Sequence, residues 1–166
     1  MALSDDELRN AIAELLSGHT VLTLATVGGK KPHAVSLMYA YDERFDIYWL
    51  SDPETRHSRH LEHAAVCAVT IAGQHKDFRA IRGLQMIGTG ALLADDEEAN
   101  QRLALLTARY RFLEAFASGK LAGQLDAAGI YRYRPSEITL IDNSLGFGFK
   151  QTLHVAAVAS SVPYSG

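Results

Sequence analysis

Apolar residues near the start of the chain recur at the spacing of an amphipathic helix. Ser4 precedes three acidic residues, a pattern typical of a helix N-terminus, and Gly18 marks the end. One apolar stripe lies between them: Leu8, Ile12, Leu15 and Leu16. The pattern predicts a helix over residues 4–17.

Apolar and β-branched segments follow, separated by turn-forming residues. The turn Gly28-Gly29-Lys30-Lys31 between two such segments predicts a β-hairpin. Glycines at positions 83, 88 and 90 indicate bulges or strong coiling in a long strand, which a closing barrel needs. We predict antiparallel strands over residues 19–27, 32–41, 45–51, 64–72 and 79–94.

The second half of the sequence adds a helix and the final strands. Four acidic residues at 95–98 begin a helix with an apolar stripe that ends at Leu113. Segments 130–133 and 138–141 predict two last strands, separated by Pro135. Since short antiparallel strands come first and the main helix comes late, the order argues against a parallel nucleotide-binding sheet. It predicts a small barrel with a few helices packed outside.

Composition narrows the class of protein. At 166 residues the chain fits one domain, which we place at residues 1–155 with a tail at 156–166. A net charge of -3 provides no general field that would gather nucleic acid or anionic lipid. The lone Cys67, the acidic N-terminus and the lack of a long apolar segment lead us to expect a cytoplasmic protein without a membrane span.

The segment between Tyr48 and His63 carries the strongest chemical signal. An apolar strand ends at Ser51, and a turn marked by Pro53 then leads into a set of hydrogen-bond donors. These are Thr55, Arg56, His57, Arg59 and His60. Such donors at a helix start hold a phosphate or a carboxylate. The alternative is a solvated basic helix face.

Three other features of the sequence could serve a ligand. Arg82 and Gln85 each bring one polar side chain to an otherwise apolar face of the predicted strand, where a neighbouring backbone group could also satisfy them. The loop from Asp142 to Lys150 combines Asn143 and Lys150 with aromatic residues, and could cover a planar ligand or be only a glycine-rich connection.

The sequence lacks the motifs of several kinds of site and enzyme. His57, His60 and His63 recur every third residue, which spreads them over about a third of the circumference of a helix. No cysteine lies nearby and only Glu62 could complete a metal site, so the sequence argues against metal binding. The chain has neither a Gly-x-Ser-x-Gly elbow nor a P-loop lysine motif, which argues against a serine hydrolase and a nucleoside triphosphatase. No residue is identified as a catalytic acid or base.

Residues 19–152 resemble the pyridoxamine 5′-phosphate oxidase-like FMN-binding split-barrel superfamily. The resemblance is carried by Tyr48-Trp49-Leu50-Ser51 with Thr55-Arg56-His57, and by Ile81-Arg82-Gly83-Leu84-Gln85. More narrowly, the second stretch and Asp142-Asn143-Ser144-Leu145-Gly146-Phe147-Gly148 are similar to a small, uncharacterised bacterial branch. The fold implied is mainly β (α+β), a six-stranded antiparallel split β-barrel with flanking helices.

The resemblance implies an FMN-dependent oxidoreductase that is a homodimer, with the cofactor between its subunits and a small-molecule substrate. Where the family has a phosphate-binding lysine, this chain has His57. The chain also lacks the oxidases' arginine-bearing C-terminal arm, so pyridoxamine phosphate is not expected as substrate. The implied FMN-binding residues are Ser36, Ser51, Thr55, Arg56, His57, Arg82, Gln85, Asn143 and Lys150. The alternatives are a deazaflavin-dependent reductase and a non-catalytic flavin- or haem-binding carrier or sensor.

Overall fold

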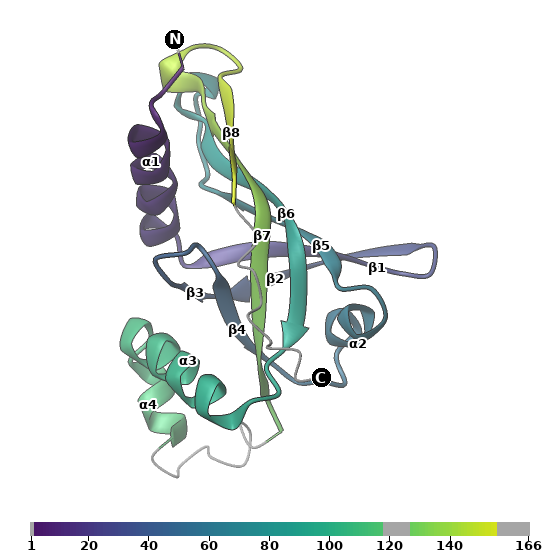
Figure 1. Ribbon diagram of the computed structural model, residues 1–166. Helices are drawn as coiled ribbons and strands as arrows, with labels where there is room; N and C mark the ends of the chain where they lie inside the picture. Colours follow the sequence, from purple (N-terminus) through teal and green to yellow (C-terminus); the bar gives the residue numbers. More distant parts are fainter. Residues whose placement is uncertain (1, 118–126, 156–166) are drawn as a thin grey trace, which may run out of the picture.

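An antiparallel sheet forms the centre of the computed structural model, which describes residues 2–117 and 127–155 (Figure 1). The described strands are β1 (Val21–Gly28), β2 (Lys31–Met38), β3 (Ala40–Tyr41), β4 (Ile47–Ser51), β5 (Val66–Ala72), β6 (Arg82–Leu92), β7 (Gly129–Asp142) and β8 (Lys150–His154). The helices are α1 (Asp5–Gly18), α2 (Arg56–His63), α3 (Asp96–Arg109) and α4 (Phe112–Ala117), with short 3-10 turns η1 (Phe78–Ala80) and η2 (Asn143–Leu145).

The order of the strands explains why the sheet curls. Hydrogen-bonded neighbours follow the order β2-β1-β5-β6-β7-β4-β3. Its two ends, β2 and β3, are consecutive in the chain and are separated only by Tyr39. Because the two edges must come close together, the sheet bends round into a barrel. The predicted split-barrel fold is confirmed, with eight strands in the described residues in place of six.

The barrel is split along one edge of β7. The first residues of this strand pair with β4, from Ser51↔Gly129 to Ile47↔Tyr133. Later residues on the same edge pair with β8, from Glu137↔His154 to Ile141↔Lys150. The opposite edge of β7 pairs with β6 along nearly its whole length. One strand therefore connects both ends of the molecule.

The predicted break at Pro135 was wrong, since β7 runs through it as a single 14-residue strand. The register of β6 shifts between Ile87 and Gly88, so that Gly88 lies opposite Pro135. A Cβ atom on Gly88 would lie 2.2 Å from the backbone oxygen of Arg134, so the strands can approach this closely only at a glycine. Strand β8 was not predicted.

Helix α1 forms as predicted and covers one end of the sheet. The Ser4 side chain accepts a hydrogen bond from the Glu7 backbone while the Glu7 carboxylate accepts from Ser4, a complete capping box. The predicted stripe from Leu8 to Leu16 is buried in the main core. Gln151 of β8 exchanges two 2.8 Å hydrogen bonds with the backbone of Leu3 and thereby ties the start of α1 to β8.

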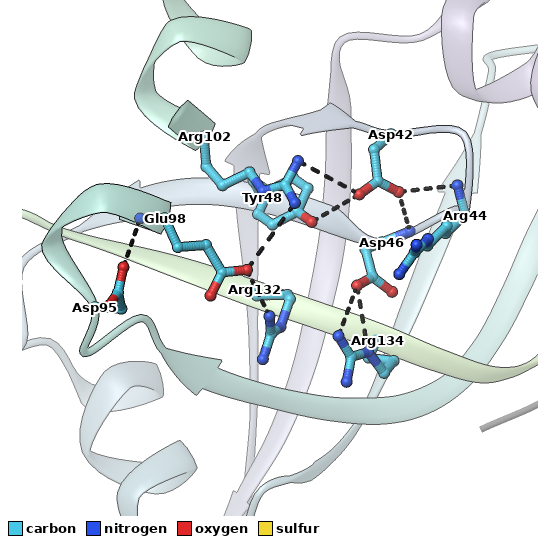
Figure 2. Close-up of polar contacts among 9 residues, drawn as sticks. All are labelled: Asp42, Arg44, Asp46, Tyr48, Asp95, Glu98, Arg102, Arg132 and Arg134. Carbon is cyan, nitrogen blue, oxygen red and sulfur yellow. Dashed lines mark hydrogen bonds and ion pairs between the residues drawn. The ribbon is translucent and has the colours of Figure 1, made fainter. Parts of the chain in front are cut away.

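Helix α3 is attached to the sheet by a network of charged side chains (Figure 2). Asp42, in the turn between β3 and β4, accepts a 2.8 Å hydrogen bond from the hydroxyl of Tyr48 and lies 3.7 Å from Arg102 of α3. Glu98 of α3 pairs with Arg132 of β7 at 2.8 Å. Because most of these groups are half-buried or buried, they fix where α3 sits.

Candidate functional site

The end of β4 and the start of α2 bring three predicted site residues together. The Oγ of Ser51 lies 2.7 Å from Nε2 of His57 and 3.3 Å from Oγ1 of Thr55. The Oγ1 of Thr55 is in turn 3.2 Å from the same imidazole nitrogen. We call Ser51, Thr55 and His57 the hydroxyl-imidazole cluster. Ser51 and His57 are both buried, so only a ligand seated in the fold could reach the cluster.

The first turn of α2 has backbone donors available beside this cluster. Thr55 is the N-cap residue, but its side chain does not cap the helix. Its hydroxyl donates to the backbone oxygen of Asp52 and lies 2.8 Å from Oγ of Ser58. The first backbone N–H bonded within the helix is that of Arg59, to Thr55. The N–H groups of residues 56–58 therefore have no acceptor within α2, and the helix dipole favours an anion there.

The two arginines of this segment differ. Arg59 forms an ion pair with Glu54, so its positive charge is already compensated. Arg56, the first residue of α2, is exposed and makes no ion pair with any residue that the structure describes. Arg56 is therefore the guanidinium available to a ligand at the start of the helix.

Two further imidazoles surround His57. His33 of β2 stacks parallel to it with ring centroids 6.3 Å apart, and His60 of α2 meets His33 edge-on at 6.0 Å. We call His33, His57 and His60 the imidazole triad. Burial, and secondarily the proximity of His33 and His60, lower the pKa of His57. The ring of His57 is thus held neutral at neutral pH.

The position of His60 is fixed by the hairpin of β1 and β2. Its Nδ1 lies 3.0 Å from Oγ1 of Thr26, which is buried. A Cβ atom on Gly28 would lie 2.2 Å from Nε2 of His60, so the imidazole occupies space that any other residue at position 28 would fill. Figure 1 shows α2 beside this hairpin.

Three of the predicted residues lie at the opposite end of β7. Ser51 pairs with Gly129 and Arg82 with Asp142, so about 40 Å of strand separates the two positions. Arg82 forms ion pairs with Asp142 at 2.7 Å and with Glu14 at 3.3 Å. Asn143 donates to the backbone oxygen of Phe78, and Lys150 is exposed at the start of β8.

The remaining two predicted residues, Ser36 and Gln85, are exposed. Gln85 lines a depression of about 340 Å³ on the outer face of β1, β5, β6 and β7. Ser36 lines another, of about 270 Å³, between β2 and the α3–α4 pair. Because Ser36 is an odd number of residues from His33, the two side chains point to opposite faces of β2. Neither residue joins the hydroxyl-imidazole cluster within one copy of the chain.

His33, Thr26 and Ser58 belong to the surroundings of the cluster but were not predicted. The two-residue turn at Gly29 places Thr26 opposite His33, and this pairing could have been read from the hairpin signal. The approach of the hairpin to α2 depends on the closed barrel and has no local signal. Across residues 2–117 and 127–155, no group of three or more His, Cys, Asp or Glu side chains could hold a metal ion.

A match to a protein-family model identifies the class of this protein. The model of the family described as Pyridoxamine 5'-phosphate oxidase matches residues 8–139, and the chain belongs to this family. The match includes β1 to β6 and most of β7, and therefore the cluster and the triad. In the part of the chain that the structure describes, no helix is both long and apolar enough to cross a membrane.

Individual relatives place the chain in the bacterial UPF0306 branch of this family. It is 33% identical over 141 residues to a UPF0306 protein of Klebsiella pneumoniae (strain 342), covering 84% of this chain and 88% of that protein. The resemblance to this branch is thereby confirmed. Two solved structures share the fold at lower identity.

A putative pyridoxamine 5'-phosphate oxidase from Listeria innocua gives a TM-score of 0.65 at 19% identity, covering 81% of this chain and 98% of that one. A heme binding protein from Mycobacterium smegmatis gives 0.70 at 16% identity, covering 93% and 59%. At these identities the likeness establishes the split barrel and nothing about the ligand.

Proposed function

We propose that this protein binds FMN and is a flavin-dependent oxidoreductase of the pyridoxamine phosphate oxidase type. The observation that carries the proposal is the convergence of Ser51, Thr55 and His57 beside the uncapped start of α2. The sequence predicted Thr55 and His57 as phosphate ligands and Ser51 as a residue at the edge of the flavin ring, and the three side chains contact one another. The family match supports a flavin as the molecule that carries the phosphate.

The donor set suits a phosphate monoester. The unpaired N–H groups of α2 and the exposed guanidinium of Arg56 can donate to phosphate oxygens, and the hydroxyl groups of Ser51 and Thr55 can do so by exchanging their present partners. His57 replaces the lysine of the family pattern, and its imidazole can donate one hydrogen bond when neutral and carries positive charge when protonated. Bound FMN would supply hydride or electron exchange, while the protein binds it, orients it and excludes water.

We further propose that the protein is a homodimer with the cofactor between its subunits. The outer face of β5 and β6 exposes Val66 (69%) and Ile87 (53%) beside Ala68 and Gln85. Apolar side chains on a sheet face are typical of a surface that a second copy covers. In such a dimer Gln85, Arg82, Asn143 and Lys150 would have to reach the partner's flavin, since they do not reach the cluster in their own subunit.

Fluorescence titration with FMN and with riboflavin tests the proposal. Riboflavin lacks the phosphate, so it should bind at least about 100-fold more weakly than FMN, because two charge-assisted hydrogen bonds contribute about 3 kcal/mol or more. The double variant Ser51→Ala, Thr55→Val should lose most of this preference. Thr152→Val removes the hydroxyl pair of Thr139 and Thr152 on the outside of β8 and serves as control. A wild-type protein that binds FMN and riboflavin equally would contradict the phosphate assignment.

A haem-binding carrier or sensor is the second candidate. The observation that favours it is the imidazole triad, since haem iron takes an imidazole ligand, and a structural neighbour is described as a heme binding protein. A Soret band on haem addition that disappears in His57→Ala or His60→Ala, together with no FMN binding, would favour this function. Titration with a deazaflavin in parallel would distinguish the third possibility, a deazaflavin-dependent reductase.

A further inference from the structure

The imidazole triad gathers three titratable rings from two elements at the start of α2. His33 comes from β2, while His57 and His60 come from one face of α2. The triad adjoins the hydroxyl-imidazole cluster through His57, which belongs to both. His33 was not predicted as a ligand-binding residue, and His60 was predicted only as one of the donors that follow Ser51.

The triad has no anionic partner in the part of the chain that the structure describes. No carboxylate oxygen there lies within 4.0 Å of the three rings, and the only imidazole-carboxylate pair is His154 with Glu137, at 3.9 Å on β8. Glu54, the nearest acid to Thr55 in the chain, is paired with Arg59. A positive charge on the triad would therefore lack compensation from these residues.

The other titratable and charged groups around the triad are few. Arg56 lies on the same helix, and Tyr131 of β7 contacts Ser58 with a hydroxyl whose pKa is raised by burial. A cavity of about 530 Å³ beside His60 is also lined by Glu54, Arg59, Glu62 and His63, and the charges of Glu62 and Asp52 help to raise the pKa of Tyr131. From β4 the triad is faced by the neutral hydroxyl of Ser51. None of these carboxylates pairs with a triad nitrogen, so a bound anion would supply negative charge that the described residues do not place against the rings.

We infer that His33, His57 and His60 form a proton-coupled extension of the phosphate site, so that a phosphate monoester dianion binds together with one proton taken up from solvent by the triad. This inference rests on the proposed function and names what regulates that site. The proton resides on an imidazole nitrogen, and the phosphate remains a dianion. Since coupling is reciprocal, acidification strengthens phosphate binding, and bound phosphate favours the protonated triad.

The physical basis is the difference between the free and the bound site. Without an anion, burial and the neighbouring rings lower the pKa of His57, so protonation is unfavourable. A dianion beside Ser51 and Thr55 reverses this electrostatic balance, because an opposite charge within a few ångströms favours the charged imidazole. A lysine at position 57, as in the family pattern, would carry its charge in both states and give no such coupling.

The test is the pH dependence of FMN affinity measured by fluorescence quenching. The phosphate of FMN has a second pKa of about 6, so it is a dianion between about pH 7 and pH 8.5. Over that interval we expect the affinity of the wild-type protein for FMN to rise about fivefold to tenfold as the pH falls. Riboflavin affinity should not change, because riboflavin has no phosphate.

Variants assign the effect to the triad. His57→Gln should reduce the change to less than about twofold, and His33→Asn and His60→Asn should each weaken it. These last two residues are only partly buried, so their variants keep the test open if His57→Gln does not fold. His75→Asn, in the exposed loop after β5, is the matched control and should behave as wild type.

The outcomes separate this inference from the proposed function. FMN binding that prefers FMN over riboflavin but does not vary with pH would overturn the inference and leave the proposed function standing. If the three triad variants and His75→Asn all keep the pH dependence of the wild-type protein, the inference is also overturned and the proposed function stands. A wild-type protein that binds neither FMN nor inorganic phosphate at any pH would overturn both.

Discussion

The replacement Asp42→Ala should destabilise the protein strongly, because this carboxylate satisfies several donors under α3 (Figure 2). Asp42 accepts hydrogen bonds from the hydroxyl of Tyr48 at 2.8 Å and from the backbone N–H groups of Arg44 at 3.0 Å and Asp46 at 3.1 Å. Tyr48 and Asp46 are buried. An alanine at position 42 therefore leaves two buried donors without an acceptor.

The magnitude follows from those two donors. An unsatisfied buried donor costs about 1–3 kcal/mol, so two of them should lower the free energy of unfolding by about 2–6 kcal/mol. For a domain of this length, 1 kcal/mol shifts Tm by about 2–4 °C, which gives a decrease of about 4–24 °C. Asp42→Asn keeps one acceptor oxygen, which can serve the backbone N–H groups of Arg44 and Asp46, but it replaces the oxygen that accepts from Tyr48 and loses the charge near Arg102. It should therefore destabilise the protein less than Asp42→Ala.

Thermal and urea unfolding followed by circular dichroism would measure both effects. Asp77→Ala is a suitable control, since Asp77 also accepts from a backbone N–H, at 2.9 Å, and pairs with an arginine, but lies at the surface. It should destabilise the protein clearly less than Asp42→Ala, because an exposed ion pair contributes little to stability. If Asp42→Ala and Asp77→Ala destabilise the protein equally, the burial argument for Asp42 is refuted.

Three further predictions concern the sheet and the cluster. Gly88→Ala should destabilise the fold by about 3 kcal/mol or more in urea unfolding, since its Cβ would lie 2.2 Å from a backbone oxygen, whereas Gly18→Ala, with nothing within 4 Å, should be close to neutral. Ile87→Glu should convert the proposed dimer to a folded monomer, which light scattering would detect. A wild-type protein that is itself a monomer would contradict the proposed dimer. The Tm of ligand-free protein should fall between about pH 7 and pH 5, because the lowered pKa of His57 lets the unfolded chain take up a proton first, and His57→Gln should reduce this fall.

Local signals in the sequence predicted α1 and the faces of β6. The capping box and apolar stripe of α1 lie within one short segment, and alternation along β6 placed Gln85 and Leu84 on opposite faces, as observed. The continuity of β7 through Pro135 could not be predicted, because it depends on the register shift at Gly88 in another strand. Strand β8 has a single buried residue, Leu153, so its pattern is too weak to indicate a strand.

For the candidate site, the sequence predicted what is local to α2. Ser51, Thr55 and His57 lie within seven positions of one another, and a turn into a helix brings them together. His33 could not be linked to them, because the contact joins a hairpin to a helix through barrel closure. The cofactor roles of Ser36, Arg82, Gln85, Asn143 and Lys150 remain predictions, since each would need a partner copy or ligand to bring it to the cluster.

Strand β7 also constrains how the polypeptide acquires its shape during synthesis. Strand β4 ends at Ser51, yet the partner for its second edge begins at Gly129. A ribosome must therefore produce the whole intervening stretch before that edge is covered, and contacts this far apart in sequence form slowly. Until then β4 presents bare amide and carbonyl groups to other nascent chains, which makes the interval before β7 emerges the stage most exposed to aggregation.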